Sequence, residues 1–253
     1  EIANEPIIRD SLWEVLVGRE EVGGSYPVFI RECRYMVIDL ELLKEIRRSS
    51  NVRFTDVLLT ALSNSLEGCF VKWGETVEQL QIFITARMPM SDQLEGLTNL
   101  FTVAMLELPI TGKDKMKKIQ VSQERLKKLP DYSVNYWLLR VAFTIFPATL
   151  LSKFAVCSQA TLSTSNVPGP KEYIKIRGSR VTDMAFFLPN RDMIGVGISF
   201  LSYANRFSIG ISVDENLLSS ASQADEILKG IVHSIDRMHS SVSTLNENPS
   251  KRE

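Results

Sequence analysis

STSNVPGP, residues 163–170, runs from small hydroxylated side chains through an asparagine into a turn built from two prolines and one glycine. A strand over 157–166 would alternate its side chains between two faces, with Thr161, Ser163 and Ser165 on one and Leu162, Thr164 and Asn166 on the other. Hydroxyls that face a cleft can donate hydrogen bonds to a developing oxyanion, and an asparagine at the strand end can fix the neighbouring backbone. The alternative is a polar edge strand that ends in a rigid turn.

The VPGP end of this stretch predicts a rigid exit from the strand. Pro168 and Pro170 fix φ, and we expect Gly169 to permit a turn that other residues adopt only at a cost. The prediction is therefore a hydroxyl-bearing strand whose end is held in one position.

The regions on either side predict an α/β fold in which helices cover a mixed β-sheet. Runs rich in β-branched and aromatic residues predict strands at 28–40, 80–90, 100–110, 157–166, 173–188, 193–203 and 206–214. Helical spacing predicts helices at 40–49, 55–73, 113–130 and 223–239. Asp39 and Thr55 are the expected N-caps of the first two helices.

One domain is expected over residues 27–240. Residues 1–26 look like a connector, and the polar tail 241–253 is expected to be disordered. The first residue is Glu1 and the first methionine is Met36, so we expect a piece of a longer chain. The apolar stretch 136–156 is interrupted by charges and a proline; it is either a buried helix kinked at Pro147 or a helix that touches a membrane through one face.

Composition argues against several classes of function. The chain has 29 Lys and Arg against 30 Asp and Glu, so net charge alone attracts neither nucleic acid nor an anionic surface. Its three cysteines form no CxxC pair, which favours a reducing compartment, and no metal site is expected. The two histidines, His233 and His239, lie six apart on the last predicted helix and cannot share a metal through that helix. No obvious general base is present.

At this point the sequence resembles the wax ester synthase and acyl-CoA:diacylglycerol acyltransferase (WS/DGAT) family, specifically its C-terminal half. Residues 165–170 match the SNVPGP signature of that family. RFTDVLLTAL at 53–62 is similar to TVNDVLLAAL, and IFITAR at 82–87 is similar to VPVSLR with Arg87 in the arginine position. LTNLFTVAMLELP resembles the GN…LP segment with Asn99 in place, and ISFLSYANRFSIGISVD resembles the family's final motif.

The resemblance implies one half of the two-half fold of chloramphenicol acetyltransferase and the CoA-dependent acyltransferases. In that fold a histidine of an HHxxxDG motif in the N-terminal half deprotonates an alcohol, which attacks the thioester of acyl-CoA. A serine or threonine of the facing half stabilises the oxyanion. By carry-over, Ser165 and Asn166 are the catalytic candidates. The substrate-side candidates are Thr55, Asp56, Arg87, Asn99, Ser163 and Thr164.

Two positions depart from the family pattern. Thr55 stands where the family has the asparagine of its Asn-Asp pair, and Ala204-Asn205 stands where it has a glycine turn. Asp56 is either a substrate-side residue or a charge favoured at a helix start. Arg87 meets either a CoA phosphate or an internal carboxylate.

The resemblance implies acyl-CoA as a co-substrate with no bound cofactor, and a fatty alcohol or diacylglycerol as acceptor. The expected partners are the missing N-terminal half and a membrane surface, but no nucleic acid. The expected location is intracellular and membrane-associated, at the endoplasmic reticulum or plasma membrane if the source is eukaryotic. The alternative is a non-catalytic module of the same fold that binds lipid or a partner.

Overall fold

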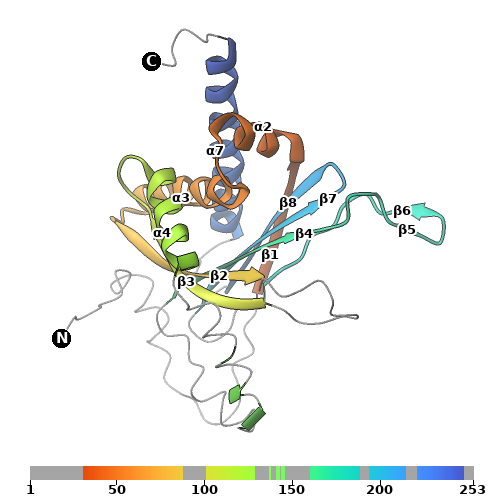
Figure 1. Ribbon diagram of the computed structural model, residues 1–253, viewed down its shortest axis with the longest axis horizontal. Helices are drawn as coiled ribbons and strands as arrows, with labels where there is room; N and C mark the ends of the chain where they lie inside the picture. Colours follow the sequence, from red (N-terminus) through yellow and green to blue (C-terminus); the bar gives the residue numbers. More distant parts are fainter. Residues whose placement is uncertain are drawn as a thin grey trace.

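A six-stranded sheet forms the centre of the computed structural model (Figure 1). The structure describes residues 31–87, 101–128, 137, 141–142, 144–145, 160–188, 194–214 and 221–247. The strand order is β1-β8-β7-β4-β2-β3. These strands are β1 (Arg31–Asp39), β2 (Gln79–Arg87), β3 (Phe101–Pro109), β4 (Leu162–Pro168), β7 (Val196–Tyr203) and β8 (Arg206–Asp214).

The sheet is mixed, as the sequence predicts. β4 lies in its interior and pairs in parallel with β2 on one side and with β7 on the other. The three outer pairings, β1 with β8, β7 with β8 and β2 with β3, are antiparallel. An interior strand has no free edge, so the polar character of β4 is not explained by an edge position.

The helices gather on one side of the sheet (Figure 1). They are α2 (Leu40–Ser50), α3 (Phe54–Trp73), α4 (Lys115–Lys128) and α7 (Ala221–Glu247). The core lies between them and the apolar face of the sheet, where Ile198, Phe200, Ile209 and Ile211 are all at most 1% exposed. Ser65 Oγ of α3 donates to the Ile227 carbonyl of α7 at 2.7 Å. Gly230 leaves room for this close approach, because a Cβ there would clash with Ser65.

The cap of α2 is confirmed and the predicted cap of α3 is wrong. Asp39 accepts a hydrogen bond from the Glu41 amide at 2.9 Å, and α2 begins at Leu40. α3 begins at Phe54, one residue before Thr55, with Arg53 at the N-cap position. The reason is Asp56, whose carboxylate accepts from the Arg53 amide at 3.0 Å and so fixes the first turn one step earlier.

Residues 173–188 do not form the single strand that their composition predicts. β5 (Lys175–Ile176) and β6 (Ser179–Arg180) form a small hairpin, which projects beyond the sheet in Figure 1. Arg177 and Gly178 both have positive φ, 49° and 83°, which turns the chain back on itself. Residues 181–188 then form no strand, and the carbonyls of Phe186 and Leu188 accept hydrogen bonds from side-chain hydroxyls.

The last helix is longer than expected. It continues to Glu247 and so enters the segment 241–253 for which the sequence predicts disorder. Hydroxyls of Ser240, Ser241 and Thr244 each donate to a carbonyl four residues earlier, at 2.8–2.9 Å. Hydroxyl side chains that hydrogen-bond to carbonyls of their own helix are compatible with a helix end in solvent. The predicted connector 1–26 and most of the apolar stretch 136–156 lie outside the described residues.

Candidate functional site

The hydroxyl run of β4 is split between the two faces of the sheet. Leu162 and Thr164 are buried on the face covered by the helices, and Leu162 belongs to the core there. Ser163 and Ser165 alternate with them and therefore lie on the opposite face, which we call the open face. The predicted alternation is thus confirmed. It means that Ser165 and its neighbour Asn166 do not point into the same space.

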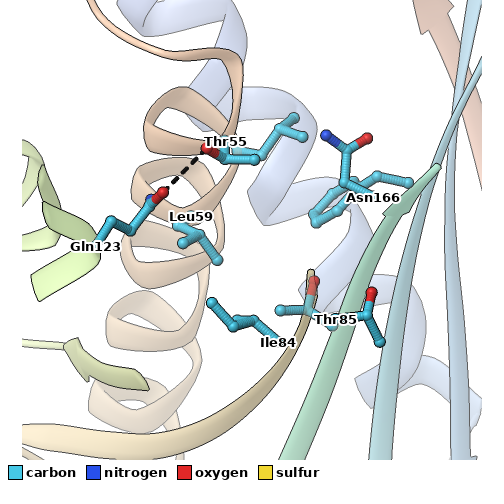
Figure 2. Close-up of a pocket in the computed structure, with 9 residues that line it drawn as sticks. Thr55, Leu59, Ile84, Thr85, Gln123 and Asn166 are labelled. Carbon is cyan, nitrogen blue, oxygen red and sulfur yellow. Dashed lines mark hydrogen bonds between the residues drawn. The ribbon is translucent and has the colours of Figure 1, made fainter. Parts of the chain in front are cut away.

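A small pocket lies on the helix side, between the N-terminal half of α3 and strands β2, β4 and β7 (Figure 2). Its volume is about 60 Å³, and it is lined by Thr55, Leu58, Leu59, Ile84, Thr85, Gln123, Thr164, Asn166 and Phe200. Most of this wall is apolar, with polar groups at a few points. Such a lining suits the apolar part of a ligand whose orientation is set by a few hydrogen bonds. Three predicted residues, Thr55, Thr164 and Asn166, meet here although 111 residues separate the first from the last.

Gln123 of α4 forms hydrogen bonds that hold the polar rim of the pocket in place. Thr55 Oγ1 donates to Gln123 Oε1 at 3.1 Å, the contact marked by the dashed line in Figure 2. Gln123 Nε2 in turn donates to Asp56 Oδ1 at 2.9 Å. Gln123 is 9% exposed and links the pocket residue Thr55 to the buried Asp56. No pattern in the sequence points to Gln123, because its role depends on how α4 packs against α3.

Asp56 is completely buried, and protein donors surround its carboxylate. Oδ2 accepts from the Arg53 amide at 3.0 Å, from Arg53 Nε at 3.2 Å and from Gln120 Nε2 at 3.4 Å. With Gln123 on Oδ1, both oxygens have partners. This arrangement favours the helix-start interpretation of Asp56 over direct contact with a substrate.

Thr85 borders the pocket near the end of β2, but its side chain is directed to the open face, where its hydroxyl lies 2.8 Å from that of Ser165 and shares a hydrogen bond with it. Ser165 is 7% exposed, while Thr85 on β2 is exposed. Ser199 of β7 is the register partner of Ser165, and its hydroxyl donates to the Phe186 carbonyl. Ser212 Oγ donates to the Leu188 carbonyl at 2.7 Å. The segment 181–188 therefore crosses the open face over β7 and β8.

Gly169 fixes the exit of β4 through close approach rather than through an unusual φ. Its amide donates to the Ser202 carbonyl at 2.9 Å, and a Cβ at this position would clash with the same carbonyl. Ala204 N donates to the Pro170 carbonyl at 2.8 Å on the following turn. The end of β4 is therefore held against β7 by contact at Gly169, whereas the rigidity predicted for VPGP stays a prediction.

The remaining predicted residues are only partly placed. Ser163 is half-buried on the open face, two residues before Ser165, between Phe83 of β2 and Gly197 of β7. Arg87 ends β2 opposite Phe101, and its side chain lies outside the described part of the structure, as does Asn99 entirely. The sequence does not predict a role for Thr85, because a single threonine in a strand becomes informative only once the register with β4 is known.

The histidines and the buried cysteine among the described residues show no arrangement typical of a catalytic or metal site. Among those residues no group of acidic, histidine or cysteine side chains is arranged to hold a metal ion. His239 Nε2 contacts Glu45 Oε2 at 2.5 Å, and His233 is exposed on α7. Burial, with a smaller contribution from Glu226, raises the pKa of the Cys69 thiol to about 11, so this cysteine is a poor nucleophile. Within the same residues no helix is long and apolar enough to cross a membrane.

Comparison with protein families and curated proteins gives a consistent result. The family model described as "WS/DGAT C-terminal domain" matches residues 97–239. "Probable diacyglycerol O-acyltransferase tgs1" of Mycobacterium tuberculosis is 24% identical over 79% of this chain. "O-acyltransferase WSD" of Acinetobacter baylyi is 21% identical over 77% of this chain. In both cases the match covers 45% of the relative, so the chain spans about half the length of the curated relatives it matches.

Solved structures agree on the fold. The wax ester synthase/diacylglycerol acyltransferase from Marinobacter aquaeolei VT8 superposes with a TM-score of 0.59 at 17% identity, covering 84% of this chain and 49% of the other. The epimerization domain from the third module of tyrocidine synthetase B gives 0.52 at 15% identity, covering 92% and 56%. Shared architecture at such low identity confirms the predicted α/β fold class, one half of a larger two-half fold.

Proposed function

We propose a function from the premise that this chain belongs to the WS/DGAT C-terminal domain family. It is the C-terminal half of an enzyme that transfers a long-chain acyl group from acyl-CoA to a fatty alcohol or diacylglycerol. The observation that carries this proposal is the nearly buried hydroxyl of Ser165, presented on the open face by an interior strand. A hydroxyl held by the sheet can stabilise charge that develops beside it without reorganising.

The reaction requires a donor of this kind. The alcohol oxygen forms a bond to the thioester carbonyl carbon, its proton passes to a general base, and the carbonyl oxygen becomes negative. Ser165 Oγ–H donates to that oxyanion until the intermediate collapses and the CoA thiolate leaves. Removal of one such donor typically lowers the rate by about 100- to 1,000-fold.

The pocket on the helix side suits a different task. Leu58, Leu59, Ile84 and Phe200 offer apolar contact, and Thr164 and Asn166 bring two polar groups to the β4 side of it. We assign to this pocket contact with an apolar part of the substrate, and to Asn166 a role in holding the strand end beside Ser165. Arg87, Asn99 and Ser163 remain candidates for the substrate side.

The general base belongs to another part of the parent protein in this proposal. We expect an HHxxxDG motif in an N-terminal half that faces the open face. Alone, this chain would then be inactive or nearly so, because general-base help contributes about 100- to 10,000-fold. No bound cofactor is needed for the transfer.

We also propose that the parent protein is intracellular and works at a membrane surface, where its lipid substrates are. The support comes from Trp137, Val141 and Ile145, which have helical conformation and are 57%, 49% and 65% exposed. Large apolar side chains that are exposed in this way suit contact with a lipid interface.

The full-length parent protein tests the proposal. It is incubated with a long-chain acyl-CoA and with either a fatty alcohol or diacylglycerol, and ester formation is measured for the wild type and for a variant with the second histidine of HHxxxDG replaced by alanine. The expected result is ester formation that this substitution abolishes. Failure to acylate any alcohol would favour the alternative, a lipid- or partner-binding module, which the replacement of the family asparagine by Thr55 motivates.

A further inference from the structure

The hydrogen bond between Thr85 and Ser165 joins two strands that are far apart in the sequence. Ile84 and Thr164 are register partners in the parallel pairing of β2 with β4, so the next residue of each strand lies on the open face. Thr85 Oγ1 and Ser165 Oγ are 2.8 Å apart, a normal distance for two hydroxyls. Among the described residues Thr85 is the one hydrogen-bond partner of the Ser165 hydroxyl.

Either of two hydroxyls that share one hydrogen bond can be its donor. If Ser165 donates to Thr85, its only proton is used and cannot reach an oxyanion. If Thr85 donates to Ser165, the Ser165 proton is free to point at a ligand. Ser199 does not compete for Ser165, because its hydroxyl donates to the Phe186 carbonyl instead.

We propose that Thr85 is a positioning residue for Ser165, donating its hydroxyl proton to Ser165 Oγ so that Ser165 donates to the oxyanion. This inference rests on the proposed function. A chain of two hydrogen bonds that ends on a negative oxygen polarises each member and strengthens the terminal donor. The branched Cβ of threonine restricts rotation, which keeps Oγ1 directed at Ser165.

The test compares four variants of the full-length parent protein: Thr85→Val, Thr85→Ser, Ser165→Ala and the double variant Thr85→Val with Ser165→Ala. Valine keeps the shape of threonine and removes the hydroxyl, whereas serine keeps the hydroxyl. We expect Thr85→Val to lower kcat by about 3- to 10-fold with KM little changed, the effect of losing one neutral hydrogen bond. Thr85→Ser should retain most of the wild-type kcat.

The double variant separates positioning from a general structural role. If Thr85 acts through Ser165, the double variant is no slower than Ser165→Ala alone, because the two effects are not additive. Wild-type kcat in Thr85→Val, or a full additional loss in the double variant, overturns the positioning role while leaving Ser165 as the donor. Wild-type activity in Ser165→Ala overturns both the donor role and the inference that depends on it.

Discussion

The helix face and the open face of β4 differ in what their side chains touch, although they alternate along one short strand. On the helix face, Leu162 is part of the core and Thr164 lines a largely apolar pocket. On the open face, Ser163 and Ser165 carry small hydroxyls, and Ser165 shares a hydrogen bond with the exposed Thr85. Core packing therefore accounts for Leu162, whereas it does not account for the hydroxyls of Ser163 and Ser165. The comparison motivates the proposal that the chemistry belongs to the face that carries Ser165.

The largest effect is expected on the helix side, at Asp56. Replacing Asp56 by alanine leaves Arg53 and two glutamine amides without their acceptor, and we expect a loss of about 3–5 kcal/mol in the free energy of unfolding. Urea denaturation of the parent protein measures it. Glu124→Ala, which removes the exposed partner of Arg53, is the matched control and should cost less than about 1 kcal/mol. A stable Asp56→Ala variant with a raised KM would instead make Asp56 a substrate residue.

At the end of β4, we expect Gly169→Ala to destabilise the protein by about 2 kcal/mol, because the new Cβ must displace the Ser202 carbonyl of β7. Gly68→Ala is the control. Gly68 is exposed in α3 with open space around it, so alanine there should be neutral or stabilising by up to about 1 kcal/mol. Thermal unfolding compares the two. Equal melting temperatures would mean that the strand end is not held by this contact.

We expect the free energy of unfolding to depend on pH through Cys69, which lies on the helix side of the sheet. Its pKa is raised from 9.0 to about 11 in the folded protein, so between these values the unfolded chain releases a proton that the folded chain keeps. The contribution of Cys69 to the free energy of unfolding is therefore fully present below pH 9. It falls by on the order of 1–2 kcal/mol as the pH rises towards 11. In Cys69→Ala this part of the decline should be missing when unfolding is followed from pH 8 to pH 11. An identical slope in both proteins would contradict the assignment.

The smallest effect is expected at the β7–β8 turn. Ala204 has a φ of 51°, a conformation that glycine adopts more easily. Ala204→Gly should stabilise the protein by about 0.5–1 kcal/mol and leave both faces of β4 unchanged. Melting temperature and kcat measured together check this. A variant with altered kcat would show that the turn reaches the open face.

The sequence predicts features that depend on neighbours in the chain. Asp39 is recognisable as a cap because its partner is two residues away, and the alternation of β4 follows from the strand period. The prediction of Thr55 as a cap is wrong because the carboxylate of Asp56 sets the start of α3. Thr85 and Gln123 could not be found, since their roles require the register of β2 with β4 and the packing of α4 on α3.

The central claim of the proposed function is that Ser165 on the open face donates to the oxyanion, whereas the helix face of β4 carries the core and a pocket for an apolar part of the substrate. The most direct test measures kcat and KM of the parent protein for Ser165→Ala and for Thr164→Val, two adjacent substitutions on opposite faces of β4. We predict that Ser165→Ala lowers kcat by about 100-fold with little change in KM. Thr164→Val keeps the shape of the pocket wall but removes one of its polar groups, so we expect any effect in KM, with kcat within about threefold of the wild type. A Thr164→Val variant as impaired as Ser165→Ala, or a Ser165→Ala variant with wild-type kcat, would contradict the account.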